Sequence, residues 1–228
     1  MTWILRLLVL SGCAGAAFPA TAADRALSYS DRPLDFSLQF AEHKIDIAYP
    51  GATVATSVKR VGIVWRERYG RRVQLGLLGG YAFLSQTDNP ATAGIEPKGY
   101  YAGVSLYLDL YAAEPIDVFL STAYLYQHVD HESAAQSVDL TWREPNIQLG
   151  AGVKLGNRVR AYGGLVYASV DGTQRQSGAV NETRGIESAG RTSGFGGLEL
   201  GLDGDDYVGV VAASGTNRSA GLYFGRRF

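Results

Sequence analysis

The sequence predicts an all-β protein, an antiparallel up-and-down β-barrel that spans a membrane. Three observations support this fold class. After residue 23 no helical periodicity persists, and segments alternate apolar residues with polar residues or glycine. The connections between these segments are alternately tight and long. The final segment is apolar on one face and ends on an aromatic ring, whereas chain ends are usually polar and frayed.

The N-terminal segment has the pattern of a secretory signal peptide. Arg6 precedes an apolar run over 7–18, and Ala20-Thr21-Ala22 supplies a small-x-small cleavage pattern. The run is shorter than the ~17 residues that a spanning helix needs. We therefore expect a signal peptide over 1–23 and a single mature β-barrel domain over 24–228.

The cysteine of this chain lies inside that predicted signal peptide. Because Leu10-Ser11-Gly12-Cys13 resembles a bacterial lipoprotein box, lipidation of Cys13 is an alternative to ordinary cleavage. Ordinary cleavage would remove Cys13 and leave a mature chain without a thiol. Such a chain could form neither a disulfide framework nor a cysteine-based metal site.

The alternating segments are long enough to cross a membrane as strands. In Tyr100–Tyr111, for example, the even positions are mostly aliphatic and the odd positions carry tyrosine, glycine, serine and aspartate. A spanning barrel strand needs ~9–11 residues. We expect ten such strands, at about 36–48, 58–69, 72–85, 98–111, 115–128, 138–155, 158–170, 193–203, 206–214 and 218–228.

The connections predict the orientation of the barrel. Tight turns fall at 69–71, 112–115, 156–157 and 204–205, and longer polar connections fall between them at 49–57, 86–97, 129–136 and 171–192. All long connections then lie at one end and all tight turns at the other, as in outer-membrane barrels with short periplasmic turns and long external loops. The longest, 171–192, is polar and glycine-rich, and we expect it to be a mobile external loop.

The last strand carries a family signature. Ala220, Leu222, Phe224 and Phe228 share one face of it. With the signal peptide and the alternating strands, it makes the chain resemble the small bacterial outer-membrane β-barrel proteins, the OmpA/OmpX-like group in the broad sense, over essentially the whole mature length. The resemblance implies location in the cell outer membrane and recognition of these four residues by the outer-membrane assembly machinery. Arg226 departs from the apolar residue usual at its position.

Two segments break the alternation. Near Pro145 the apolar residues change from even to odd positions, which predicts a β-bulge over Arg143–Pro145. The first segment changes likewise between Phe40 and Ile45. If this first segment is not a spanning strand, a barrel of eight strands is the alternative.

Strand direction and face together predict a charge cluster in the lumen near the tight turns. A charge that faces lipid at mid-depth costs ~2–4 kcal/mol, so charges on the less apolar face should point inward and pair. The expected members, flanked by Tyr107 and Tyr111, are Arg66, Arg68, Asp109, Asp117, Lys154, Glu199, Asp203 and Arg227.

Function is less specified than fold. The 21 basic and 22 acidic residues give no basic surface for nucleic acid. We expect a barrel with a filled lumen that acts through its surface loops, in binding or adhesion, or in membrane integrity. Its partners would be outer-membrane lipid and lipopolysaccharide, the assembly machinery and an extracellular ligand.

Two alternatives remain open. A ten-stranded barrel is close to the size at which side chains fill the interior, which leaves room at most for a narrow diffusion pore. An enzyme acting on lipid A or peptides would need a catalytic group such as His128 beside Asp130, but the strand pattern directs both away from the lumen. We expect no enzymatic activity, no cofactor and no metal site.

Overall fold

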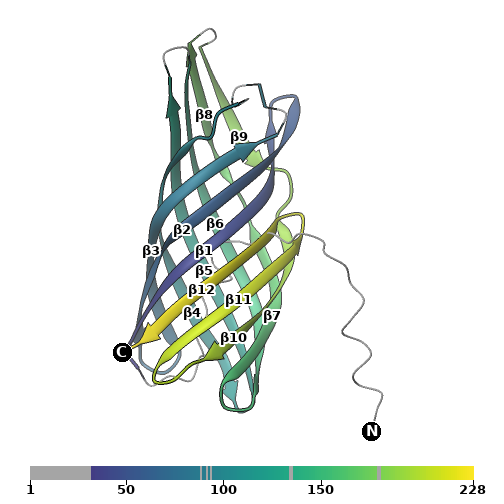
Figure 1. Ribbon diagram of the computed structural model, residues 1–228. Helices are drawn as coiled ribbons and strands as arrows, with labels where there is room; N and C mark the ends of the chain where they lie inside the picture. Colours follow the sequence, from purple (N-terminus) through teal and green to yellow (C-terminus); the bar gives the residue numbers. More distant parts are fainter. Residues whose placement is uncertain (1–31, 88, 91, 93, 134–135, 179–180) are drawn as a thin grey trace, which may run out of the picture.

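The computed structural model describes residues 32–228 except 88, 91, 93, 134–135 and 179–180, so the predicted signal peptide lies outside the described residues. The described chain folds into antiparallel strands (Figure 1). No helix among its described residues is long and apolar enough to cross a membrane. The strands are β1 (Leu34–Tyr49), β2 (Ala52–Tyr69), β3 (Val73–Gln86), β4 (Lys98–Ala113), β5 (Ile116–Glu132), β6 (Gln136–Leu155), β7 (Val159–Ala168), β8 (Asp171–Gly178), β9 (Glu182–Ser188), β10 (Thr192–Gly201), β11 (Asp206–Gly215) and β12 (Arg218–Arg227).

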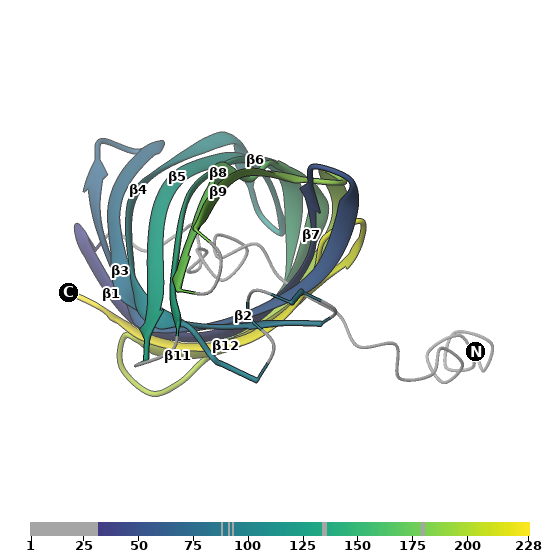
Figure 2. The same cartoon turned by 90° about the horizontal axis from the view of Figure 1, so that it is seen from above.

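Ten of these strands close into a ring, in the order β1 to β7 and then β10 to β12. The last strand closes against the first, with partners from Asp35↔Arg227 to Lys44↔Arg218. Beside this ladder the amide of Phe228 donates to the carbonyl of Leu34 at 2.8 Å. Figure 2 shows the strands wound around a common axis. The C-terminus therefore lies beside the start of β1, at the end that also holds the tight turns.

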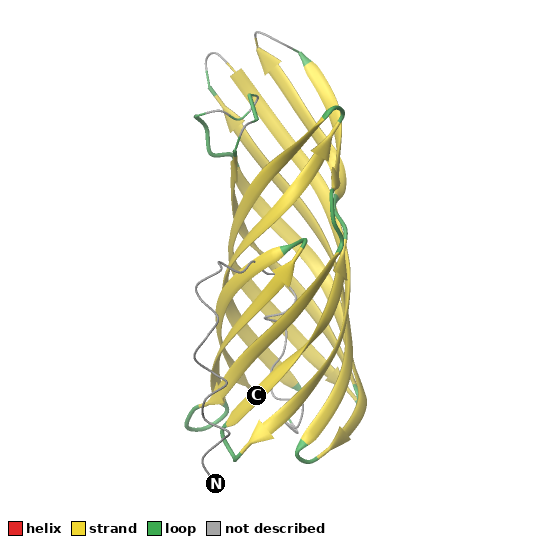
Figure 3. Cartoon of the chain, turned by 90° about the vertical axis from the view of Figure 1, so that its right-hand side faces the viewer, coloured by secondary structure: helices red, strands yellow, loops and turns green. Residues whose placement is uncertain are grey.

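β8 and β9 extend the wall of the ring beyond the ends of β7 and β10 to β12. β8 pairs with the first part of β6, from Gln136↔Gly178 to Arg143↔Asp171, and β9 pairs with the end of β1 through Ile47↔Ser188 and Ala48↔Glu187. Above the short hairpin of β11 and β12, eight strands thus complete the ring: β1 to β6, β8 and β9. Figure 3 shows this taller wall rising beyond the short hairpin.

The expected long external connections are mostly strands. The predicted mobile loop 171–192 instead forms β8 and β9, β2 begins at Ala52, and β5 continues to Glu132. Those loop expectations were wrong, because a strand whose outer face meets water is polar and resembles a loop in sequence. Among the longer connections predicted, 87–97 stays outside the strands in the described chain.

The predicted irregularities were also misplaced. β6 pairs with β5 without a shift through Leu125↔Glu144 and Tyr124↔Pro145, so the bulge predicted over Arg143–Pro145 is absent. β1 likewise pairs with β2 without a shift. A register shift does occur in β4, between Asp109 and Tyr111.

Pro145 nevertheless marks a junction in the wall. Its carbonyl accepts a bond from the amide of Ser169, in the break between β7 and β8. The proline nitrogen points to the same side of β6 as this carbonyl, where the neighbouring strand is interrupted, so its missing N–H costs no ladder bond.

The sequence changes parity because the surroundings of the wall change. We call the part of the ring with apolar outward residues the lower region, and the part from Glu42, Lys59 and Arg143 upward the upper region. On β6 the inward residues remain even-numbered throughout, but they are polar in the lower region (Glu144, Gln148) and apolar in the upper region. The outward residues change in the opposite sense.

Candidate functional site

The lower region is apolar outside, and its interior holds buried polar and charged side chains beside a cluster of buried aromatic and aliphatic ones. Phe36, Leu38 and Phe40 project from β1 with about two-fifths of their surface exposed, while Ser37 and Gln39 between them are buried. The same exposed apolar belt continues around the ring through Val61, Ile63, Trp65, Leu75, Leu77, Tyr81, Val104, Tyr124, Ile147, Leu149, Leu165, Leu198, Leu200, Val210 and Phe224. An exposed apolar surface of this extent marks contact with another apolar phase.

A fully buried ion pair lies in the lumen of the lower region, over β6. Arg160 at the start of β7 donates from Nε to Asp117 Oδ1 at 3.0 Å and from Nη2 to Asp117 Oδ2 at 2.6 Å. Both side chains are fully buried. This two-point geometry is the strong form of a charge pair and holds β5 and β7 at a fixed distance.

Two further pairs lie beside it, each extended by a tyrosine. Arg66 Nη1 lies 3.4 Å from Asp35 Oδ2, and the Tyr207 hydroxyl donates to Asp35 Oδ1 at 2.5 Å. Arg227 Nη2 donates to Glu199 Oε1 at 2.8 Å, and the hydroxyl of Tyr223 donates to the same carboxylate at 3.1 Å. The carboxylates therefore receive both charge and hydrogen bonds, which buried ions require.

A fourth pair lies nearer the upper region. Arg60 on β2 donates from Nη2 to Glu144 at 2.6 Å and from Nε to Gln127 Oε1 at 2.8 Å, so it joins β2 to β5 and β6 across the lumen. His43 is also fully buried in this interior.

The residues expected to form the charge cluster do not share one place. Arg66, Asp109, Asp117, Glu199 and Arg227 are buried in the lumen, and Arg68 is half-buried. The remaining two lie at the lower rim, where Lys154 pairs with the exposed Glu114 at 2.8 Å and the exposed Asp203 pairs with Arg158 at 3.0 Å.

The two tyrosines expected beside the cluster diverge. Tyr107 points inward and donates to Asp109 Oδ1 at 3.0 Å. Tyr111 is 56% exposed and points outward. The expectation for Tyr111 was wrong because the register shift between Asp109 and Tyr111 changes which residues face the lumen.

Sequence reasoning missed four members of the ion pairs: Asp35, Arg60, Glu144 and Arg160. The available signal was unbroken alternation along each strand. Arg160 shares the inward parity of Tyr162, and Glu144 shares that of Gln148. Assuming a bulge next to Glu144 concealed its direction.

Aromatic rings fill the lower lumen between these ions by lying over glycines of neighbouring strands. A side chain on Gly209 would collide with the ring of Tyr223, and one on Gly225 would collide with that of Tyr207. Phe119 covers Gly150 in the same way. The glycines thus provide the space in which large inward rings lie against the wall.

The lumen of the upper region is apolar. Its buried residues belong to one cluster with the composition of an ordinary protein core: Ile45, Ile47, Val54, Val58, Leu84, Leu125, Val129, Val138, Leu140, Trp142, Val170 and Ile186. The same cluster also includes Tyr49, Val64, Leu78, Ala82 and Tyr101. The outward residues at this height include Lys44, Lys59 and Arg143.

Polar side chains cover the upper end of this core. Gln86 donates to Tyr49 Oη at 2.9 Å, the Tyr49 hydroxyl donates to Gln174 Oε1 at 2.7 Å, and Asn89 donates to Gln86 Oε1 at 2.6 Å. These bonds join β1, β3, β8 and the connection 87–97. Burial raises the pKa of the Tyr49 hydroxyl, which keeps it a hydrogen-bond donor.

The wall of the upper region ends in a free sheet edge on β9. The amide of Ala189 donates to Asp46 O at 2.8 Å, toward β1, whereas the amide of Ser188 donates to Val170 O at 3.0 Å on the other side. By alternation, Gly185 and Thr183 also point toward the β1 side, where pairing with β1 has already ended at Glu187. No described strand pairs with this edge.

His43 and His128 do not share a site. His128 lies on the outer face, with ring nitrogens 3.7 Å from Asp130 and 3.7 Å from Asp139, whereas His43 is inside the lumen. Within the described ranges, no group of three or more His, Cys, Asp or Glu side chains is placed to hold a metal ion.

The residues of the expected assembly signal lie together on β12. Ala220, Leu222, Phe224 and Phe228 all occupy the outward parity, opposite the buried Tyr223 and Arg227, and Phe228 is 57% exposed. Arg226 shares this face and lies over the Phe228 ring at 5.8 Å.

Comparison with solved structures identifies the fold. The translocator domain of the autotransporter NalP from Neisseria meningitidis aligns with a TM-score of 0.51 and 14% identity, covering 91% of this chain and 93% of that domain. The chain has the fold of a bacterial outer-membrane β-barrel. Neisserial surface protein A aligns with a TM-score of 0.43 and 14% identity over 85% of this chain and 97% of that one. The outer-membrane protease OmpT of Escherichia coli gives 0.46 and 10% over 90% and 99%.

No protein-family model matches the chain, and no curated protein matches it in sequence. The location of the barrel follows from its fold and its surface together. A closed wall satisfies its backbone hydrogen bonds internally, and the apolar belt of the lower region suits a bilayer. The protein is therefore a small β-barrel of the bacterial outer membrane, as predicted.

Proposed function

We propose that this protein is a non-conducting barrel that displays a raised sheet edge to bind an extended segment of an extracellular protein. Ten strands cross the membrane, and above it β1 to β6 continue and form a closed extension together with β8 and β9. The termini and tight turns face the periplasm. The observation that carries the proposal is the unpaired edge of β9 at Thr183 and Gly185, because such an edge is a template for strand addition.

The filling of the lumen supports a role outside conduction. A solute entering from above would meet the polar cover at Gln86, then the apolar core around Leu140, and then the ion pairs at Arg60 and Arg160. A narrow pore remains the second candidate, because tyrosines and arginines can reorient. Planar bilayers with the purified barrel should show no steady single-channel conductance.

The positions of the titratable groups favour binding over catalysis. His128 and its carboxylate neighbours lie on the outer wall of the upper region. The buried acids Asp117, Glu144 and Glu199 are each engaged by an arginine. We therefore propose no enzymatic role, and we propose the assembly machinery, outer-membrane lipid and lipopolysaccharide as further partners.

The edge can be tested with a matched pair of substitutions. Thr183→Pro removes the backbone N–H that points to the unpaired edge of β9. Thr183→Ala keeps this N–H and shortens only the side chain. We expect the native barrel and Thr183→Ala to bind surfaces coated with fibronectin, laminin or collagen, measured by surface plasmon resonance, and Thr183→Pro to bind at least tenfold more weakly. Equal binding by both variants, or no binding of the native barrel to any of the three, contradicts the proposal.

A further inference from the structure

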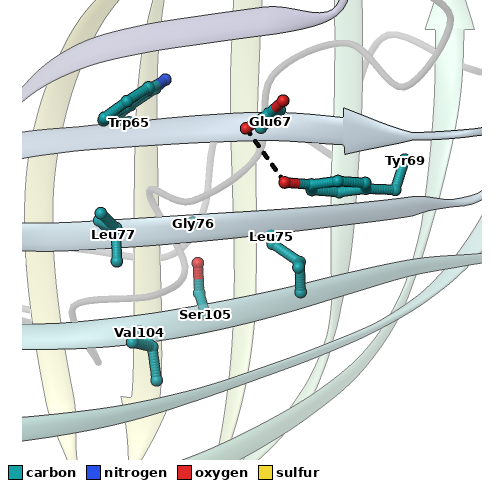
Figure 4. A pocket seen from close by; sticks show the side chains of 8 residues that line it. All are labelled: Trp65, Glu67, Tyr69, Leu75, Gly76, Leu77, Val104 and Ser105. Carbon is teal, nitrogen blue, oxygen red and sulfur yellow. Dashed lines mark hydrogen bonds between the residues drawn. The ribbon is translucent and has the colours of Figure 1, made fainter.

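A crevice opens on the outer wall at the lower end of the apolar belt. Its volume is about 340 Å³. It extends over β2, β3 and β4, and the side chains around it are seen in Figure 4. Its lining residues are Trp65, Glu67, Tyr69, Leu75, Gly76, Leu77, Val104 and Ser105.

Register explains the shape of the crevice. Trp65, Leu77 and Val104 form one row across the three strands, because Trp65 pairs with Leu77 and Leu77 pairs with Val104. Glu67 pairs with Leu75 in the next row toward the tight turns. These outward side chains are about half exposed, so the crevice is an apolar groove at the surface that contacts lipid.

Glu67 is the exception in this apolar lining. Its backbone neighbours are Leu34 on β1 and Leu75 on β3, and Trp65 and Tyr69 flank it along β2. The hydroxyl of Tyr69 donates to Glu67 Oε2 at 3.1 Å, as drawn in Figure 4. The structure pairs no cation of the described chain with this carboxylate. An ionised group beside apolar residues at the membrane boundary is suited to a cationic group from outside the protein.

Two cations follow at the same end of the crevice. Arg71 and Arg72 lie in the turn directly after Tyr69, and both are exposed. Guanidinium groups bind phosphate oxygens well. A carboxylate and two arginines at the headgroup end of an apolar groove complement a zwitterion that bears both an ammonium and a phosphate.

We propose that the crevice is a binding site for a glycerophospholipid with a primary-amine headgroup. One acyl chain lies along Leu77 and Val104, the ammonium donates hydrogen bonds to Glu67, and the phosphate meets Arg71 and Arg72. The depth of the site fits this assignment, because Trp65 and Tyr69 are the residue types that anchor at the headgroup level. The inference rests on membrane placement of the barrel and is independent of ligand binding at β9.

The test compares two headgroups that share a phosphate. The mature barrel is placed in nanodiscs with equal amounts of phosphatidylethanolamine and phosphatidylcholine, and the retained lipid is measured by native mass spectrometry. A quaternary ammonium cannot donate a hydrogen bond. The native barrel should therefore retain phosphatidylethanolamine about two- to fivefold in excess, the ratio expected from a partly exposed ion pair.

Variants separate the contributions. Glu67→Gln should retain the two lipids equally, and the control Glu132→Gln, at the other end of the barrel, should keep the excess. Arg71→Ala with Arg72→Ala should lower retention of both lipids without changing their ratio. Leu77→Trp should fill the groove and abolish retention. Heat-modifiable migration verifies folding of each variant.

Two results would overturn the proposal: equal retention of both lipids by the native barrel, or an unchanged excess in Glu67→Gln. Neither outcome bears on the sheet edge, because the Thr183 variants are assayed against immobilised proteins.

Discussion

Strands β1 to β6 run through both the lower and the upper region of the barrel, and the polarity of their two faces is opposite in the two regions. On β6, Glu144 and Gln148 point into the lower lumen, while Leu140 and Trp142 point into the upper lumen from the same face. No register shift separates them. The alternation of residues along a strand therefore specifies its two faces. Whether water or lipid lies outside the wall specifies which of the two faces is apolar.

The two regions also differ in what stabilises them. The upper region has an apolar core surrounded by water, so burial of Leu140 and its neighbours drives its folding as in a soluble protein. In the lower region lipid covers the apolar face, and the interior depends on ion pairs such as Arg160 with Asp117. Substitutions in the two regions should therefore act by different mechanisms.

The largest effect is expected from the buried ion pair of the lower region. Arg160→Leu leaves Asp117 charged and fully buried, which should reduce the free energy of unfolding by about 3–5 kcal/mol. Urea unfolding of the barrel in lipid vesicles measures this change.

The double variant Arg160→Leu, Asp117→Leu is its control. It removes both charges, so it should recover most of the loss. A single variant as stable as the native barrel would mean that water reaches Asp117 and that the lower lumen is open.

A pair of leucines on β6 compares the two regions directly. Leu140→Ala creates a cavity in the upper core and should cost about 2–5 kcal/mol. Leu149 faces lipid, where acyl chains fill the space that Leu149→Ala leaves. This substitution should therefore lose only the free energy of transferring the removed methyl groups from water, about 1–2 kcal/mol. Equal costs in the same urea assay would contradict the assignment of different surroundings to these residues.

The smallest effect concerns the space that a glycine leaves for an arginine. A methyl group on Gly152 would collide with Arg160 Nη2, so Gly152→Ala should cost about 1–3 kcal/mol by displacing the guanidinium. Gly185→Ala is the matched control, because nothing lies within 4 Å of the added group. If thermal unfolding shows the two variants to be alike, the guanidinium is not held against the wall as described.

Much of the lower region was predictable from sequence. The alternating residues of Tyr100–Tyr111 and the apolar face of Leu222 and Phe224 indicate strands whose outer side meets lipid, and the fold was correctly predicted as an outer-membrane barrel. The inward direction of Arg66 and Asp117 followed from the cost of placing charge in lipid.

The upper region was not predictable by the same reasoning. Polar residues and glycines in 171–192 were interpreted as a loop, although many are water-facing positions of β8 and β9, and a side chain on Gly172 would meet Trp142. The change of polarity at Arg143 was interpreted as a bulge, because a single solvent was assumed along each strand. Only the pairing of β6 with both β7 and β8 removes this ambiguity.

β6 keeps one register along its length, while the medium outside the wall changes from lipid in the lower region to water in the upper region. The most direct test is electron paramagnetic resonance of nitroxides at single cysteines along β6, with oxygen reporting lipid and a nickel chelate reporting water. We expect labels at Asp139, Thr141 and Arg143 to be accessible to nickel, and labels at Ile147, Leu149 and Ala151 to be accessible to oxygen. Labels at the even positions should be restricted in motion, because they point into the filled lumen. A change of the accessible residues from odd to even between Arg143 and Ile147 would contradict this expectation and establish a bulge there.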